Sequence, residues 1–238
     1  MDTRTRHALK KDKFAQAAAT SASWVSEHRS GVERWAIGAG VLLVLAVGAL
    51  IYWNITTSAA DRALGAAMDA YSAPLTEPGA PALSGEYKTA KERSQDANRQ
   101  FTVVAEKYGW LPEGAEARYF AGVTYEDLGD NEAAQSELEQ VANAWNWGNR
   151  NLSNLAKLAL AGLYQQTGRD RQAIAIYQAL AAKPSETVPA SRAQLALADL
   201  YATEDKQDLA RALWATVKDA DKGGAAGSIA AQKLAGAQ

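Results

Sequence analysis

Residues 160–180 read LAGLYQQTGRDRQAIAIYQAL, and this stretch decides the fold. Gly168 lies between two apolar patterns, at a point where a helix can end in a left-handed cap. Small side chains at Ala161 and Ala173 allow the segments on either side of that glycine to pack closely. Tyr164 and Tyr177 follow these alanines and fill the next layer. The stretch therefore predicts two antiparallel helices joined by a tight turn.

The same order of residues occurs once before this stretch and once after it. Tyr125, Tyr164 and Tyr201 are 39 and 37 residues apart. One such helix pair cannot bury its apolar face alone, so neighbouring pairs must stack. In the third copy, Asp205 stands where the first two copies have glycine. The two further copies comprise Ala121, Gly122, Tyr125, Gly129, Ala134, Leu138 and Val141, and Leu197, Ala198, Tyr201, Ala210, Trp214 and Val217.

These residues resemble the tetratricopeptide pattern, whose ideal period is about 34 residues. Short inserts at residues 145–151 and 184–189 account for the longer spacing. The predicted fold class is all-α, with a single N-terminal transmembrane helix followed by a tetratricopeptide-like α-solenoid of helix pairs. Residues 113–238 are expected to form the repeats and a C-terminal capping helix, and residues 56–112 a degenerate helical repeat with a Pro-rich insertion at 72–85.

The 26 residues between Arg34 and Asp61 carry no charge, and their centre reads WAIGAGVLLVLAVGALIYW at positions 35–53. About 20 helical residues cross a hydrocarbon layer of roughly 30 Å, so residues 35–55 have the length of a transmembrane helix. Trp35 at one end, and Tyr52 and Trp53 at the other, are predicted to mark the two membrane interfaces. A buried core helix or a cleaved signal peptide fits this length less well.

The charge changes sign across the span, which predicts its orientation. Residues 1–34 have seven basic and four acidic residues, a net charge of +3, whereas the remainder has 18 basic and 23 acidic residues, a net charge of −5. The basic side is expected to stay in the cytoplasm and the C-terminal part to be translocated across the membrane. Residues 8–29 fit either an amphipathic helix on the inner leaflet or a solvated tail.

The composition gives no support for catalysis. The chain has no cysteine, and its two histidines, His7 and His28, belong to no metal-ligand spacing. We find no phosphate-binding glycine loop and no nucleophile motif, so neither a cofactor, a metal nor an enzyme activity is predicted. The acidic C-terminal part also lacks the basic stripe of a nucleic-acid-binding protein.

Protein binding is the remaining function, and two sets of residues are candidates for it. Trp145 and Trp147 lie beside Arg150, and tryptophan beside arginine is frequent at interface hot spots; alternatively, the indoles fill the gap between stacked units. The second set is the predicted concave side of the stack, with little positive charge. It comprises Tyr119, Glu126, Asp127, Leu155, Leu158, Gln165, Gln166, Arg192, Leu195 and Asp199.

The order of parts resembles a known bacterial family. A basic segment around Phe14 precedes an anchor that ends in Tyr52, Trp53 and Asn54, and a degenerate repeat stack follows. This layout is similar to the YfgM-type family, the ancillary subunit of the SecYEG translocon. The resemblance implies an inner-membrane protein with partners in the translocon, in a membrane-anchored periplasmic prolyl isomerase or chaperone, and in unfolded exported clients.

Two other functions fit the same features of the sequence. The first is an envelope-assembly scaffold in outer-membrane or cell-wall biogenesis, which uses the repeats without a translocon. The second is a signalling regulator that acts through the cytoplasmic segment at residues 1–34.

Overall fold

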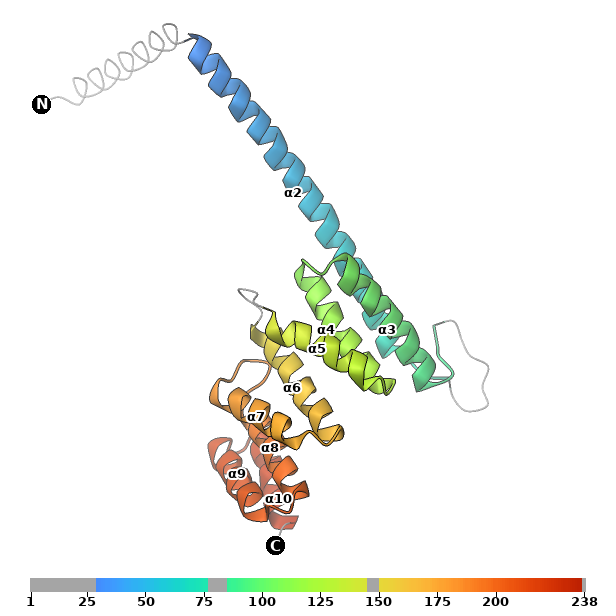
Figure 1. The fold of residues 1–238 in the computed structure, drawn as a ribbon, viewed down its shortest axis with the longest axis vertical. Helices are drawn as coiled ribbons and strands as arrows, with labels where there is room; N and C mark the ends of the chain where they lie inside the picture. The colour runs from blue at the N-terminus through green and yellow to red at the C-terminus, as the bar shows by residue number, and fades with distance from the viewer. Residues whose placement is uncertain (1–28, 77–84, 145–149, 237–238) are drawn as a thin grey trace, which may run out of the picture. The chain divides into compact units, whose positions relative to one another are not determined.

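The computed structural model describes residues 29–76, 85–144 and 150–236, and within these ranges every extended regular element is a helix (Figure 1). An isolated bridge between Leu75 and Tyr87 is the one strand-like pairing recorded there. The prediction of an all-α fold is thus confirmed. The chain divides into two compact units, Met1–Thr56 and Thr57–Gln238, which are treated separately below.

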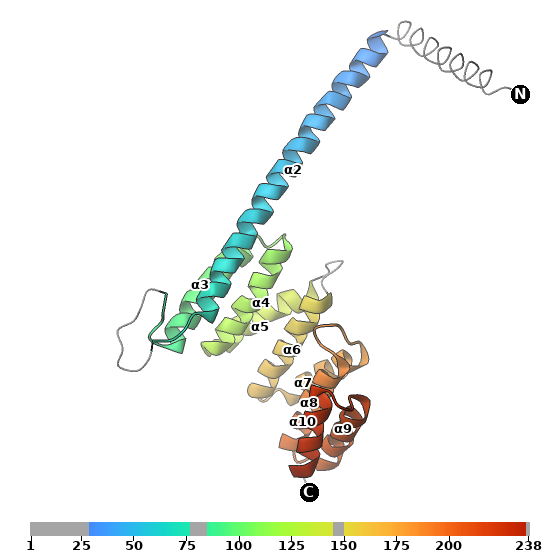
Figure 2. The same cartoon turned by 180° about the vertical axis from the view of Figure 1, so that it is seen from behind.

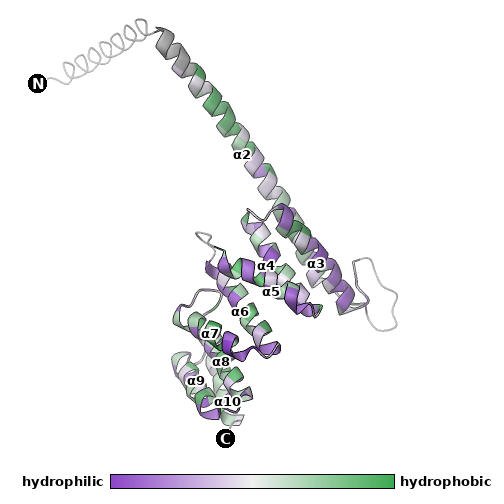
Figure 3. Ribbon diagram, viewed as in Figure 1, coloured by the Kyte–Doolittle hydropathy of each residue, from purple (hydrophilic) through white to green (hydrophobic). Residues whose placement is uncertain are grey.

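The first unit contains most of the long apolar helix. Helix α2 covers Arg29–Ser72, and from Ile37 onward it is long and apolar enough to cross a membrane. The most apolar part of the helix buries no side chain, and Figure 3 shows that hydrophobic residues predominate there. A core helix of a water-soluble domain would bury such side chains. The predicted amphipathic segment at residues 8–28 lies outside the described residues.

The second unit begins with a helix pair made from the end of α2 and from α3 (Ala90–Lys107). Ala60 and Ala67 of α2 are completely buried in one core cluster with Phe101 and Val104 of α3. These small side chains let the two helices lie side by side, as Figures 1 and 2 both show. Residues 56–108 therefore supply an additional helix pair before the three recognisable repeats.

The sequence from Glu86 to Tyr108 has a helical pattern, but helix α3 begins only at Ala90. Tyr87 is held in an extended pairing, because its N–H donates to Pro74 O at 3.2 Å and its carbonyl accepts from Thr76 N at 2.9 Å. Thr89 then caps the helix by accepting from the N–H of Glu92 at 3.1 Å. The local cap and the bridge thus outweigh the helical propensity of the preceding residues.

Three helix pairs and a last single helix follow in order. Each helix contacts its neighbours in sequence, and the connections at 144–149 and 183–189 are the longer ones, where the inserts are expected. The final helix, α10, packs on α9 and α8. The pairs are α4 (Pro112–Asp127) with α5 (Asn131–Asn143), α6 (Arg150–Gln166) with α7 (Asp170–Ala182), and α8 (Ala190–Thr203) with α9 (Gln207–Ala220), followed by α10 (Ala225–Gly236).

The turns inside the three pairs have the same hydrogen-bond geometry. In each, the tyrosine carbonyl of the first helix accepts from the N–H five residues later: Asp130 N to Tyr125 O at 2.9 Å, Arg169 N to Tyr164 O at 2.7 Å, and Lys206 N to Tyr201 O at 2.9 Å. The residue before each donor has a positive φ, of 80° at Gly129, 71° at Gly168 and 61° at Asp205. The third copy thus keeps the left-handed turn with a side chain in a conformation that favours glycine.

Tyr164 joins the second pair to the first. Its ring is buried in the largest core cluster, its hydroxyl donates to Glu139 at 3.0 Å, and the guanidinium of Arg169 lies 4.3 Å from its ring centroid. Arg169 also donates to the side-chain oxygen of Gln135 at 2.6 Å. Both Glu139 and Gln135 belong to α5, so one tyrosine and the turn that follows it fix the stacking of neighbouring units.

We predict opposite effects of substitutions at equivalent turn positions. Asp205→Gly should stabilise the fold by up to about 1 kcal/mol, because glycine takes a positive φ without steric cost. Gly168→Val should destabilise it by roughly 1–2 kcal/mol for the converse reason. Unfolding of the full chain in mild detergent, followed by circular dichroism, measures both. Asp208→Gly, inside α9, is the matched control and should destabilise; a loss of stability in Asp205→Gly would contradict the shared turn geometry.

We also predict that Tyr164 contributes to the stability of the fold mainly through its ring and less through its hydroxyl. Tyr164→Ala should lower the free energy of unfolding by about 3 kcal/mol or more, because it leaves a cavity between stacked units. Tyr164→Phe should cost only about 1 kcal/mol, the value of one hydrogen bond. Equal effects of the two substitutions in the same unfolding experiment would rule out a packing role for the ring.

Candidate protein-binding face

The first helix of each pair contributes side chains to one face of the second unit, which we call the inner face. Glu126 of α4 accepts a hydrogen bond from the amide of Gln166 on α6 at 2.7 Å. Burial raises the pKa of Tyr119 on α4, and the positive charge of Arg192 on α8 opposes this effect, so the two side chains are near each other. The inner face is made up of Tyr71, Tyr119, Glu126, Asp127, Gln165, Gln166 and Arg192.

An aromatic group forms the wall of this face nearest the start of the unit. Phe101 and Phe120 are stacked with centroids 5.2 Å apart, and Tyr71 meets them at 6.2 and 6.1 Å. Tyr119 contacts Phe120 edge-on at 5.1 Å. Phe101 is fully buried, whereas Tyr71 and Tyr119 are only partly covered. Their phenol rings therefore give the inner face an apolar surface with a polar edge.

Two adjacent carboxylates lie beside this aromatic group, of which Glu126 is half-buried and Asp127 is exposed. Burial raises the pKa of Glu126, and the neighbouring charge of Asp127 adds to this effect, while the hydrogen bond from Gln166 opposes it. Burial also raises the pKa of Asp127, against the opposing effects of Arg93 and of a hydrogen bond with Ser94. The same acids contribute to the raised pKa of Tyr71, after burial as the main cause. The local potential is therefore negative.

A shallow cleft of about 500 Å³ continues the inner face between α6 and α8. Its wall includes Gly162, where a Cβ would meet no other atom within 4 Å, so the space above this helix position is open. The hydroxyl of Tyr177 lies 3.4 Å from the side-chain oxygen of Gln165 behind this wall. The cleft is lined by Gly162, Gln165, Gln166, Gly168, Asp170, Leu200 and Thr203.

Several residues expected on the concave side are engaged within the fold. Leu155 and Leu158 are partly buried against the cluster of Leu180, Val188 and Ala193. Leu195 packs in the C-terminal cluster. Asp199 forms an ion pair with Lys233 of α10 at 3.0 Å. Arg192 is exposed, with a long contact of 3.5 Å to Thr187 O.

The remaining candidates are the two tryptophans of the insert. Trp145 and Trp147 fall outside the described residues, so their role remains as predicted from the sequence. Two residues of the inner face and its cleft, by contrast, were not predicted. Tyr71 belongs to the end of the long helix, and Gly162 has no side chain to suggest a role.

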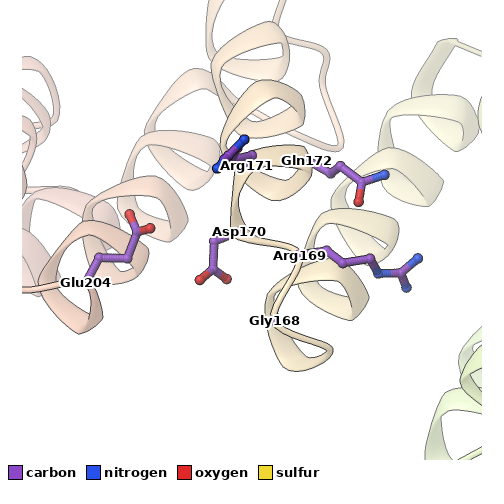
Figure 4. A pocket seen from close by; sticks show the side chains of 6 residues that line it. All are labelled: Gly168, Arg169, Asp170, Arg171, Gln172 and Glu204. Atoms are coloured by element: carbon purple, nitrogen blue, oxygen red, sulfur yellow. The ribbon is translucent and has the colours of Figure 1, made fainter.

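A second cleft, of about 440 Å³, lies at the turn between α6 and α7 (Figure 4). The carboxylates of Asp170 and Glu204 both lie on this side, while Arg169 extends in the other direction toward α5. Glu204 is paired with Lys206 at 3.0 Å. In the part of the chain that the structure describes, no group of three or more histidine, cysteine or acidic side chains could hold a metal ion.

Stacked helix pairs with closely packed small residues, repeated left-handed turns and a capping helix define a tetratricopeptide-like helical repeat protein. Such a fold is generally used for protein–protein interaction.

Comparison with solved structures supports this class. Two crystal structures of nearly identical TPR-like repeats from a putative kinesin light chain of Podosopora anserina, one a point variant of the other, superpose with TM-scores of 0.52. Each is 18% identical over 61% of this chain, and the matches cover 77% and 78% of those chains. At this identity the likeness shows the fold alone. No family model matches the sequence, and no curated protein matches it.

The raised pKa of Glu126 predicts how pH affects stability. The folded chain holds this proton more tightly than the unfolded chain, so the carboxyl's favourable contribution is complete below the unfolded pKa and is lost as the pH rises through the folded pKa. Glu126→Gln replaces the carboxyl group by an amide that does not ionise, so the variant does not lose this stability as the pH rises. The variant's stability relative to the unsubstituted chain should therefore be higher at pH 7 than at pH 4, measured by urea unfolding. Glu132→Gln, at an exposed position in the first turn of α5, is the control and should show no such gain. If Glu126→Gln changes the free energy of unfolding by the same amount at pH 4 and pH 7, the carboxylate of Glu126 is not desolvated.

Proposed function

We propose that this chain is a non-enzymatic, membrane-anchored adaptor whose inner face binds protein segments on the periplasmic side of a bacterial inner membrane. The observation that carries the proposal is the combination of two features in one chain. One is an apolar helix whose long side chains are uncovered, and the other is a repeat unit whose first helices present aromatic and acidic groups together. A helix that anchors the chain confines this binding face to the neighbourhood of the membrane.

The charge step supports the orientation in this proposal. The segment before the span has a net charge of +3 and the remainder −5. Basic residues near a single span are retained on the cytoplasmic side. The chain is then a single-pass protein with its N-terminus in the cytoplasm and residues 56–238 in the periplasm.

The chemistry of the inner face favours one kind of ligand segment. The carboxylate of Glu126 is half-buried and Asp127 lies exposed beside it, so a basic side chain placed there is attracted more strongly than by a fully solvated acid. The rings of Tyr71 and Tyr119 suit apolar or cationic side chains. Extended segments with basic and apolar residues therefore fit this face, and unfolded exported proteins expose such segments. A ligand that ends in a free carboxylate fits poorly beside two acids.

The layout of the chain supports the identity of the partners. The resemblance to the YfgM-type family, at Phe14, the anchor and its Tyr52-Trp53-Asn54 end, favours association with the SecYEG translocon. A periplasmic prolyl isomerase or chaperone is the second partner on the same ground. The adaptor would then bring such a folding factor and an emerging client together.

Site-specific photo-cross-linking in cells tests this function. A photoreactive residue in place of Tyr119 or Gln165 should cross-link to translocon subunits, to a periplasmic folding factor or to exported clients. The same residue in place of Leu209, an exposed position on α9, is the control and should not. Cross-links confined to outer-membrane or cell-wall assembly proteins would replace the proposal with the scaffold alternative. Cross-links obtained only from residues 1–34, with a soluble cytoplasmic protein, would replace it with the signalling alternative.

Gly162 provides a substitution that blocks the inner face without disturbing the fold. Because the space above it is open, Gly162→Phe should fill the cleft and abolish the cross-links from Gln165 while the chain stays folded. Gly162→Ala is the matched control; it should keep the cross-links and stabilise the helix by roughly 0.5–1 kcal/mol. Full cross-linking in Gly162→Phe would show that ligands do not use this cleft.

A further inference from the structure

Trp110 is an exposed tryptophan in the short turn between α3 and α4. In the described part of the second unit, large apolar side chains that are strongly exposed are few, and Trp110 is the bulkiest, with 55% of its surface accessible. Val103, further back on α3, is 56% exposed. The residues flanking Trp110 behave differently, because Tyr108 and Leu111 are both buried. The turn therefore directs one large indole outward between two core residues.

The turn holds Trp110 in a defined position. The N–H of Leu111 donates to Tyr108 O at 2.8 Å, and Leu111 then precedes a helix that starts at Pro112. Gly114 approaches the same carbonyl so closely that a Cβ there would lie 2.0 Å from it. The backbone is thus packed on itself at this point, so the exposure of Trp110 is a fixed property of the turn rather than the result of a loose loop.

This turn lies at the end of the unit where the chain enters it. Ala60 belongs to the same core cluster as Tyr108 and Leu111. At the other end of this helix pair, Arg93 donates to Ala73 O at 3.2 Å beside the 73–89 connection. Figures 1 and 2 both show α3 running alongside the end of α2, with the α3–α4 turn at the far end of α3 from its start at Ala90.

The distance from this end of the unit to the proposed membrane span is limited by the chain itself. Ile55 ends the predicted span, and Ala60 is already fully buried in the core of the second unit. Five residues reach at most about 17 Å even when fully extended. In the continuous helix α2 the same five residues rise only about 7.5 Å, which is close to the thickness of one headgroup layer, about 5–8 Å.

We propose that Trp110 contacts the headgroup region of the bilayer in which the chain is anchored and thereby orients the repeat unit on the membrane surface. Tryptophan is the residue most suited to this depth, because its ring is apolar and its N–H can bond to water or to a headgroup. Lys107 precedes it by three residues, is exposed and lies over the ring of Tyr108 at 5.0 Å, and a lysine near the surface is attracted to anionic lipid. The contact rests on the proposed membrane insertion of the apolar helix but not on the identity of any protein partner.

A depth measurement in pure lipid tests the contact, and the absence of cysteine from the chain makes it direct. The full chain is reconstituted into nanodiscs of phosphatidylethanolamine and phosphatidylglycerol with an environment-sensitive fluorophore on one introduced cysteine. Glu106→Cys, one turn before Trp110, reports on the turn. Leu209→Cys, at an exposed apolar position on α9, is the matched control, and Val47→Cys reports on the span.

The expected result is that the fluorophore at position 106 emits at shorter wavelength than at position 209 and is quenched by headgroup-labelled lipid, whereas that at position 209 is not. Trp110→Ser in the Glu106→Cys background should remove this quenching, and Trp110→Tyr should retain it, with the same unfolding temperature for both. Quenching at position 47 by chain-labelled lipid, together with none at position 106, would overturn the proposal and leave the anchor intact. A lack of quenching at both positions would overturn the anchor and the contact together. Quenching at position 106 that persists in Trp110→Ser would assign the contact to other residues and so overturn the role of Trp110.

Discussion

The structure of the repeat unit depends on the turn that closes each helix pair. The hydrogen bond from the N–H five residues on to the carbonyl of Tyr125, Tyr164 or Tyr201 requires one intervening residue with a positive φ. That bond fixes where the first helix ends and the angle at which the second returns. At the crossing inside the first pair, a Cβ on Gly122 would lie 2.7 Å from Leu138 Cγ, so the backbone approach leaves no room for a side chain. The tight turn and the close crossing together determine how every later helix is placed.

The inner face follows from this arrangement, because stacking uses only part of each first helix. Tyr164 at the second turn and the small residues at the crossings are buried, which leaves the positions of Tyr119, Glu126 and Gln166 outside the core. Carboxylates held there with a raised pKa lower the stability of the unit at neutral pH. Carboxylates that lower stability and make no essential core contact are typical of binding sites, where they are kept for function and not for folding. At the C-terminal end the same kind of position, Asp199, is neutralised by Lys233 of the capping helix.

The repeats could be predicted well from the sequence because the residues that define each repeat lie close together along the chain. Glycine at positions 129 and 168, small residues at fixed offsets and tyrosines at a regular spacing each have one plain physical meaning. Even the departure at Asp205 kept the left-handed conformation, because the closing hydrogen bond outweighs the moderate cost of a side chain there. The start of α3 was less predictable, because the pairing of Tyr87 with residues 74 and 76 joins segments that the sequence pattern treats separately.

The candidate site was predicted only in part for a related reason. Leucines at periodic positions give the same signal whether they face a groove or a neighbouring cluster, so Leu155 and Leu158 could not be separated from the core in advance. Tyr71 lies in a helix whose sequence is dominated by its apolar half, and the close grouping of its ring with Phe101 and Phe120 is a long-range contact. Gly162 contributes to the cleft by having no side chain, which a sequence pattern does not distinguish from any other small residue.

The proposed anchor and the Trp110 contact have different consequences for binding. A span alone confines the inner face to a thin layer above the membrane and raises its effective concentration toward any partner in the same bilayer. The repeat unit can still tilt and rotate together with the anchoring helix, however, so that only a fraction of orientations present Tyr119 and Glu126 to that partner. A second contact at Trp110 removes much of this rotational freedom before binding, and the entropy of orienting the unit is then not lost at the moment of encounter. Because a lipid contact by one indole is weak and reversible, it can bias the orientation and still release when a client displaces the unit from the surface.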